Sequence, residues 1–296
     1  MTSVTIGPDL DDLQRVVETA LGEDLRYGPD ATTAATVPAD AVAVAAFTAR
    51  KPGVLAGVPA VLAVLDAVLG ENGLGRDGSA GGFEVLDARS DGDRLAAGDV
   101  ALTVRAPVRG LLTAERTALN LLCHLSGVAT ATAAWVDAVA GTAARIRDTR
   151  KTMPGLRLLE KYAVRCGGGY NHRLGLGDAV LIKDNHVAAA GSVGAALAAA
   201  RSRAPGLPCE VEVDTLEQLD EVLALDAELV LLDNFSVGHT REAVRRRGDR
   251  PTQLESSGGL VLANAREYAA TGVDYLSVGA LTHSVSALDI GLDLRS

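Results

Sequence analysis

The residues that could carry out chemistry stand directly after short apolar runs of the sequence. Residues 180–182 (VLI) lead into Lys183, and residues 229–232 (LVLL) lead into Asp233. A short apolar run that ends in a polar cluster is typical of a buried strand followed by a loop. In α/β barrels the carboxyl ends of the strands lie on one face, and active sites are built there. We therefore expect the polar groups that follow these runs to share one site.

Residues 145–183 reverse the acidic character of the chain, with nine Lys or Arg residues against three Asp or Glu residues. Clustered cations repel one another unless an anion neutralises them, and Arg binds carboxylate or phosphate through paired hydrogen bonds. The cluster therefore predicts a pocket for a multiply anionic substrate. Its candidates stand at strand ends or in the loop GGGYNHR: Arg150, Lys151, His172, Arg173 and Lys183. We expect three further bases to be surface residues of a helix: Arg157, Lys161 and Arg165.

The run CEVEVD places its three carboxylates, Glu210, Glu212 and Asp214, on one face of a predicted strand, because side chains alternate along a strand. Carboxylates that face into a barrel are destabilising unless they are paired or bind a metal. Asp233 ends the next strand, and two carboxylates on adjacent strand ends suit Mg²⁺, which shares oxygen ligands with substrate phosphates. Ion pairs with the cluster's bases, Lys183 or Arg150, are the alternative, and the two interpretations can coexist.

Two glycine turns follow late predicted strands and offer backbone N–H groups to a phosphate. Barrels of this kind often place a phosphate site after their late strands. The residues concerned are Ser257, Gly258 and Gly259 in the first turn and Gly279 and Ala280 in the second.

A long helix with an apolar stripe is expected over residues 113–140, with Thr113 as its N-cap and Gly141 at its end. Arg116 then lies in the first turn, where a cation opposes the helix dipole. This misfit is compatible with a surface arginine or with an arginine that reaches an anion bound outside its own domain.

Strands and helices alternate from residue 145 onward, which predicts a parallel sheet flanked by helices. Six strands are expected, so residues 113–284 favour an incomplete or irregular α/β barrel. Residues 1–112 lack this rhythm and indicate an α+β sandwich, which the tail 285–296 is expected to join. The sandwich elements expected are helices over 9–21 and 58–69 and strands over 41–49 and 100–106. No role is assigned to the glycine-rich run 71–82.

The composition of the chain argues against several classes of protein. The chain has 296 residues and a formal net charge of −10, which argues against general nucleic-acid binding. Its three cysteines are far apart, so neither a disulfide framework nor a zinc site is expected. Neither a signal peptide nor a membrane span is expected, because the first residues are acidic and the Ala-rich run 188–200 is short and weakly apolar. We expect a cytoplasmic protein.

Five motifs in order along the chain closely resemble the quinolinate phosphoribosyltransferase family. They are the block from Arg147 to His186, EVEVD, LLDN, LESSGG and VGALTHS, and the upstream stretches GEDLRYGPDATT and RGLLTAERTALNLL look like the family's N-terminal domain. The resemblance implies an N-terminal α/β sandwich, a barrel of about seven strands and a homodimer that shares its sites across the interface. It also implies the Mg²⁺-dependent conversion of quinolinate and phosphoribosyl pyrophosphate into nicotinate mononucleotide, pyrophosphate and CO₂, for NAD synthesis.

The resemblance also assigns roles to the candidate residues. It implies that the quinolinate carboxylates are surrounded by Arg150, Lys151, His172, Arg173 and Lys183. Thr149 joins them as a substrate-binding residue, and Arg116 comes from the partner subunit. Lys151, Glu212 and Asp233 are the expected catalytic residues, with Glu212 and Asp233 serving the ribose hydroxyls and the metal. The two glycine turns would hold the 5-phosphate.

Three rival functions stay open from the sequence. A related phosphoribosyltransferase, or a homologue attached to molybdate transport, would keep the fold without using quinolinate. A barrel aldolase would use Lys183 to form a Schiff base. A catalytically silent homologue would only bind a nucleotide.

Overall fold

The computed structural model describes residues 7–70 and 82–295, which form two compact units. The first unit comprises residues up to Ala133, Met153–Gly168 and the C-terminal segment from Ser284, and the second comprises Ala134–Thr152 and Gly169–His283. The domain boundary expected near residue 112 stays a prediction. The glycine-rich run 71–82 lies outside the described residues except for Gly82.

The first unit contains a four-stranded antiparallel sheet in the order β12-β1-β5-β3. Its strands are β1 (Val42–Ala49), β3 (Glu84–Ala88), β5 (Val100–Pro107) and β12 (Ile290–Arg295). The C-terminal strand β12 pairs with β1, so the chain's last segment completes the first unit's sheet. A small second sheet pairs β2 (Gly53–Val54) with β4 (Arg94–Leu95).

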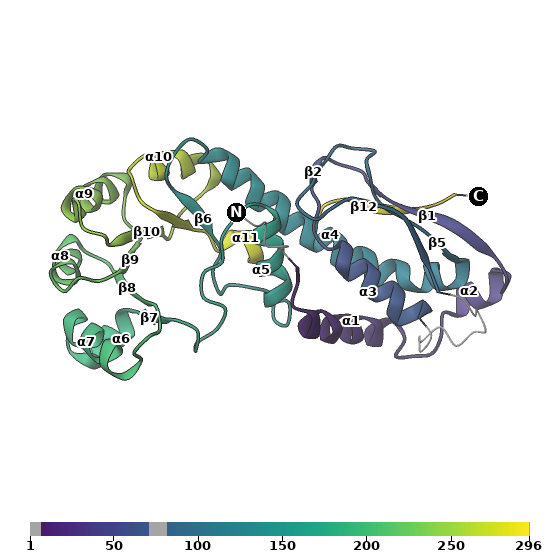
Figure 1. The fold of residues 1–296 in the computed structure, drawn as a ribbon, viewed down its shortest axis with the longest axis horizontal. Helices are drawn as coiled ribbons and strands as arrows, with labels where there is room; N and C mark the ends of the chain where they lie inside the picture. Colours follow the sequence, from purple (N-terminus) through teal and green to yellow (C-terminus); the bar gives the residue numbers. More distant parts are fainter. Residues whose placement is uncertain (1–6, 71–81, 296) are drawn as a thin grey trace. The chain divides into compact units, whose positions relative to one another are not determined.

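Helices accompany this sheet in the first unit, with α3 and α4 along one side of it (Figure 1). They are α1 (Leu10–Asp24), α2 (Ala31–Thr36), α3 (Val58–Leu69), α4 (Val108–Ala138) and α5 (Arg157–Cys166). The start of α3 is fixed by the Asp91 carboxylate, which accepts hydrogen bonds from the backbone N–H groups of Gly57 and Val58. The expected helices over 9–21 and 58–69 are confirmed.

The long helix α4 begins at Val108, five residues before the expected N-cap Thr113. Strand β5 runs directly into it, and the Val108 N–H bonds to the Ala41 carbonyl. Within this first part of the helix, a Cβ atom on Gly110 would lie 2.0 Å from Leu69 Cδ2, so the glycine permits close packing against α3. Arg116 is therefore not in the first turn, and the dipole argument for it was wrong.

Helix α5 corrects a second expectation, because Lys161 is buried rather than on the surface, with 1% of the residue exposed. Its neighbour Glu160 is fully buried as well, and its carboxylate contacts His124 Nε2 at 2.8 Å and accepts from the Met153 N–H. Their burial was not predicted, because charged residue types alone do not show which face of a helix is buried.

The second unit is built on a six-stranded parallel sheet in the order β6-β11-β10-β9-β8-β7. The six strands expected from the sequence are confirmed: β6 (Arg145–Arg147), β7 (Val180–Ile182), β8 (Cys209–Val213), β9 (Leu229–Asp233), β10 (Gln253–Ser257) and β11 (Tyr275–Ser277). The parallel α/β architecture is thus confirmed, whereas closure of the sheet into a barrel stays a prediction.

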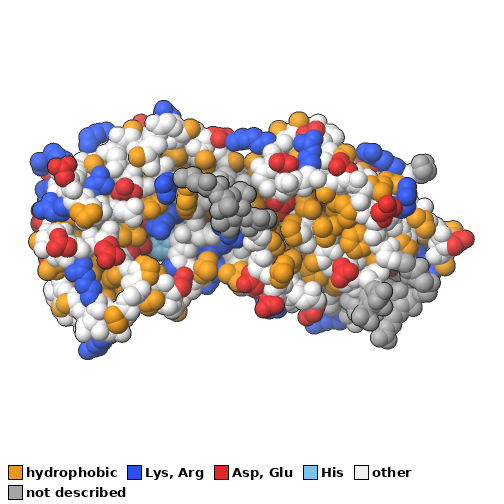
Figure 2. Space-filling model, viewed as in Figure 1, with side chains coloured by type: hydrophobic (Ala, Val, Ile, Leu, Met, Phe, Trp, Pro, Cys, Tyr) orange, Lys and Arg blue, Asp and Glu red, His pale blue; other side chains and the backbone are white. Residues whose placement is uncertain are grey.

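Helices connect these strands, and α7, α8 and α9 stand in a row beside the sheet (Figure 1). The connecting helices are α6 (Asp184–Ala190), α7 (Val193–Arg203), α8 (Leu216–Ala224), α9 (Val237–Arg247), the 3₁₀ turn η1 (Leu262–Asn264), α10 (Ala265–Ala269) and α11 (Ala280–His283). Acidic and basic side chains are interspersed over α7 to α9 (Figure 2), as on a solvated face. The fully buried residues of the strands include Val211, Val230, Leu254 and Leu276, which form the core beneath these helices.

Helix α4 is long and apolar enough to cross a membrane, judged by length and composition only. Most of its most apolar window is buried within the protein, however, as in the core helix of a soluble protein. It is therefore weak evidence for a membrane span.

Candidate active site

A cavity of about 550 Å³ lies at the carboxyl ends of the six strands of the parallel sheet. Each strand contributes from its last residues or from the loop that follows it. The candidates that line it are Thr149, Arg150, Lys151, His172, Arg173, Lys183, Glu212, Asp233, Ser257, Gly258 and Gly259. The structure therefore brings together eleven of the fourteen predicted site residues within one unit.

The basic loop after β6 is held by buried hydrogen bonds. The fully buried Asp148 carboxylate accepts from Asn171 Nδ2 at 2.6 Å and from the His172 N–H at 2.8 Å. Thr149 Oγ1 accepts from the Lys151 N–H, and the Lys151 carbonyl accepts from Thr282 Oγ1 at 2.7 Å. These contacts fix the backbone, so the Arg150 and Lys151 side chains extend from a rigid support.

Arg173 and Arg150 line the same cavity, and their positive charges repel each other. Burial lowers the pKa of Arg173, and the charge of Arg150 lowers it further. Arg173 also donates through Nη1 to the Ala179 carbonyl at 3.2 Å. Two guanidinium groups placed in this way favour an anion between them, because it would relieve their repulsion.

The carboxylate side of the cavity is formed by Glu212 on β8 and Asp233 at the end of β9, and these two strands are neighbours in the sheet. Glu212 forms an ion pair with Lys183. The alternative interpretation of Glu212 as an ion-pair partner is therefore confirmed. Because Lys183 is engaged in this way, the aldolase hypothesis, which requires a free amine, loses support. Asp233 accepts from Asn234 Nδ2 at 2.7 Å.

The first glycine turn has a backbone shape that favours glycine. Gly258 and Gly259 have φ angles of +84° and +64°, in the left-handed region that favours glycine. A Cβ atom on Gly258 would lie 2.2 Å from Asn234 Oδ1. Asn234 is itself left-handed, with φ 54°, and its N–H bonds to the Ser257 carbonyl at 2.9 Å. The ends of β9 and β10 are thus tied together, with backbone groups exposed at the cavity.

Three predicted residues do not line the cavity. Gly279 lies next to it, since a Cβ atom there would be 2.9 Å from Lys151 Cδ, and Ala280 is the exposed first residue of α11. Arg116 is an exposed residue of α4 and belongs to the first unit. Four lining residues were not among the predicted set: Leu181, Leu231, Asn234 and Ser277. Asn234 could have been found, because it follows β9 directly, next to Asp233 at the end of the strand.

Comparison with known proteins gives matches along nearly the whole chain. The family model for the N-terminal domain of quinolinate phosphoribosyl transferase matches residues 30–126, and the model for the C-terminal domain matches residues 128–293. A carboxylating nicotinate-nucleotide pyrophosphorylase of Mycobacterium leprae is 63% identical over 288 residues, which cover 97% of this chain and 98% of that protein.

Solved structures agree with this match. The nicotinate-nucleotide pyrophosphorylase of Francisella tularensis superposes with a TM-score of 0.90 at 35% identity, covering 100% of both chains. NadC from Streptococcus pyogenes superposes with a TM-score of 0.88 at 38% identity, covering 98% of this chain and 99% of that one.

Proposed function

The chain belongs to the quinolinate phosphoribosyltransferase family, and we propose from this premise how its cavity transfers a phosphoribosyl group to quinolinate. The products are nicotinate mononucleotide, pyrophosphate and CO₂, and the reaction serves NAD synthesis. The observation that supports this function is a single cavity whose wall carries bases, carboxylates and a glycine turn together. Such a wall suits a substrate pair that consists of an aromatic diacid and a sugar phosphate.

The bases hold the aromatic diacid. Arg150, Arg173 and Lys151 supply positive charge on one side of the cavity, and quinolinate supplies two carboxylates that match it. Paired hydrogen bonds from guanidinium groups fix the plane of the ring as well as its position. The ring nitrogen is then presented to C1 of the ribose, so binding performs the alignment that the bond formation requires.

The carboxylates and the glycine turn hold the phosphoribosyl group. Backbone N–H groups at Ser257, Gly258 and Gly259 bind the 5-phosphate, and Glu212 and Asp233 face the ribose. As the bond from C1 to pyrophosphate breaks, C1 becomes electron-poor, and nearby carboxylates stabilise it. The lone pair of the ring nitrogen forms the new bond to C1. The resulting pyridinium accepts the electron pair of the bond to the adjacent carboxylate, which leaves as CO₂, and the ring carbon then takes up a proton from water.

Glu212 and Asp233 fit a Mg²⁺ site by the chemistry of their donors, since both offer hard oxygen atoms on neighbouring strand ends. The metal would complete its shell with oxygens of the co-substrate and water, and when bound it would neutralise charge on the pyrophosphate. When the metal binds, Lys183 must either give up its ion pair with Glu212 or share the carboxylate with the metal. Asp233 keeps its contact with Asn234, which orients the carboxylate toward the cavity.

The functional assembly that we propose is a homodimer in the cytoplasm, in which Arg116 of the partner subunit completes each site. Figure 2 shows hydrophobic side chains gathered over α3 and α4 on the first unit, and an apolar area of this kind suits an interface.

We also propose that the parallel sheet closes into a barrel of about seven strands. Tyr170, which forms an isolated parallel bridge with Arg147, supports an additional position beside β6.

Incubation of the purified protein with phosphoribosyl pyrophosphate, Mg²⁺ and either quinolinate or nicotinate tests the function. Carboxyl-labelled quinolinate should release CO₂ and form nicotinate mononucleotide, whereas nicotinate should give no product. Turnover of nicotinate instead would indicate a related phosphoribosyltransferase. Failure to turn over either acid would support the silent homologue.

A further inference from the structure

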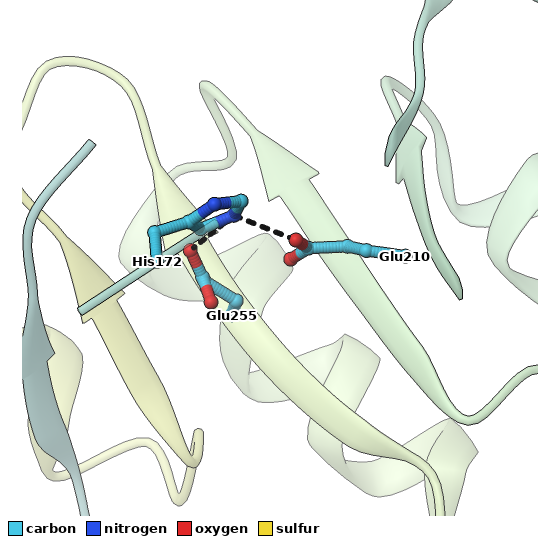
Figure 3. Close-up of side chains that lie close together, drawn as sticks. All are labelled: His172, Glu210 and Glu255. Carbon is cyan, nitrogen blue, oxygen red and sulfur yellow. Dashed lines mark hydrogen bonds and ion pairs between the residues drawn. The ribbon is translucent and has the colours of Figure 1, made fainter. Parts of the chain in front are cut away.

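Beneath the cavity lies a buried cluster of His172, Glu210 and Glu255 (Figure 3). His172 Nε2 is 2.7 Å from Glu210 Oε2 and 3.7 Å from Glu255 Oε1. Glu255 is fully buried, and Glu210 is 4% exposed. Glu210 and Glu255 come from β8 and β10, whereas His172 comes from the loop that follows Tyr170. Neither glutamate lines the active-site cavity.

The hydrogen bonds of His172 define its tautomer. The backbone N–H of Arg173 points at Nδ1 at 2.8 Å. A backbone N–H can only donate, so Nδ1 accepts and the ring proton is on Nε2. The Nε2–H group therefore donates to Glu210. A metal ligand would need a lone pair on this nitrogen, so the tautomer argues against a metal ion in the cluster, although one oxygen each of Glu210 and Glu255 has no hydrogen-bond partner among the described residues.

Glu255 and Arg147 support the cluster from the other side. Arg147 Nη1 donates to Glu255 Oε2 at 2.5 Å, and its guanidinium carbon lies 4.0 Å from the centre of the Tyr275 ring. Burial raises the pKa of Glu255, and the charge of Glu210 raises it further, whereas Arg147 and His172 act in the opposite direction. The cluster is thus a packed polar layer rather than an open site.

This polar layer separates two cavities. A second cavity of about 220 Å³ is lined by the first residues of four strands, including Val180 and Cys209, and by Glu210. His172 and Arg173 line both cavities. Glu210 therefore contacts His172 from nearer the amino ends of the strands, whereas the substrate cavity lies at their carboxyl ends.

We propose that Glu210 is a positioning residue for Arg173. Its carboxylate accepts a hydrogen bond from the Nε2–H group of His172 and so fixes the imidazole ring. Nδ1 of the same ring accepts from the backbone N–H of Arg173, which directs the arginine into the cavity. The Asp148 carboxylate accepts from the backbone N–H of His172. The backbone N–H groups of His172 and Arg173 are therefore both fixed. Both ring nitrogens of His172 are occupied in this arrangement, so the ring orients Arg173 rather than donating to a substrate carboxylate. The inference rests on the proposed function only in taking quinolinate as the anion that Arg173 binds.

The test compares Glu210→Ala, Glu210→Gln and the control Glu228→Ala. Glu228 lines the same small cavity but is exposed. Glu210→Ala should weaken equilibrium binding of quinolinate by about tenfold, as expected for loss of a hydrogen bond to a charged group. The KM for phosphoribosyl pyrophosphate should stay near the wild-type value. Glu210→Gln keeps an oxygen that accepts from Nε2–H and should restore most of the binding, and the control should match wild type.

A spectroscopic readout separates this inference from the proposed function. Histidine ¹⁵N NMR, assigned with His172→Gln, should show a single Nε2–H tautomer for His172 in wild type and a mixture in Glu210→Ala. An Nδ1–H tautomer in wild type would overturn the inference even if Glu210→Ala failed to fold. Equal losses for both substrates, or no rescue by Gln, would also overturn it. If wild type released no CO₂ from quinolinate, the proposed function would fail, while the tautomer measurement would still test the contact.

Discussion

Lys183 and Glu212 form an ion pair across the ends of the neighbouring strands β7 and β8. The Lys183 side chain is 45% exposed and that of Glu212 only 10%. A half-exposed lysine can move toward an incoming anion, whereas the carboxylate is held in the wall. The pair therefore balances the charge of Glu212 until the substrates bring their own charges.

Glu212→Ala should weaken Mg²⁺-dependent turnover more than it weakens quinolinate binding. The substitution removes a hard oxygen donor beside Asp233 and leaves the arginines of the cavity intact. Turnover measured across a Mg²⁺ titration and quinolinate binding measured without co-substrate check this. Glu217→Ala, an exposed residue of α8, is the control. A large loss of quinolinate binding with unchanged Mg²⁺ dependence would remove the metal-side assignment.

Gly258→Ala should raise the KM for phosphoribosyl pyrophosphate by about tenfold, because the new Cβ atom would collide with Asn234 and displace the turn that holds the phosphate. Gly206→Ala is a matched control, since Gly206 has φ +86° in an exposed loop with no atom within 4 Å of the new Cβ. Each variant should lose about 1 kcal/mol or more of stability from left-handed strain. Only Gly258→Ala should lose substrate affinity, and equal kinetics for the two would contradict the phosphate role.

The sequence predicted strands such as β7 and β9 well because each is a short apolar run followed by polar residues. That rule also located the cavity, since parallel strands bring their carboxyl ends to one edge whatever their order. It could not show how the layer below the cavity is organised. Glu210 was placed correctly on the same strand face as Glu212, but its contact with His172 joins residues 38 positions apart.

The errors have physical causes that a single sequence conceals. The start of α4 was expected at Thr113, but the helix begins at Val108 and includes Gly110, whose missing side chain leaves room for Leu69. Lys161 resembled a surface residue, but it is buried within the first unit. Helix α6 was not predicted, because its short run DNHVAAA has little apolar periodicity, and it has no buried residues. For Lys161, tertiary packing decided what the local pattern could not.

The thiols should resist alkylation in the native protein at pH 8. Burial raises the pKa of Cys166 to about 12, and it also raises the pKa of Cys123 and of Cys209. The thiolate is the reactive form, and a raised pKa means that it accumulates only as pH rises toward that value. At pH 8 the thiolate of Cys166 is therefore about one part in ten thousand. Iodoacetamide labelling followed by mass spectrometry should modify denatured protein fully and native Cys166 hardly at all, and rapid native labelling would contradict this.

Arg116→Ala and Lys151→Ala should each be inactive alone and should recover activity when mixed dimers are formed. Lys151 lines the cavity, whereas Arg116 is exposed on the first unit. If each cavity takes Arg116 from the partner subunit, a mixed dimer has one intact site and one doubly defective site. Half of the dimers are mixed after random reassembly, so recovery should reach up to about a quarter of wild-type activity. Mixing is done by denaturing and refolding the two variants together, with each variant refolded alone as the control. If Arg116 acted on its own subunit's cavity, every site in the mixture would lack one of the two groups, and no activity would return.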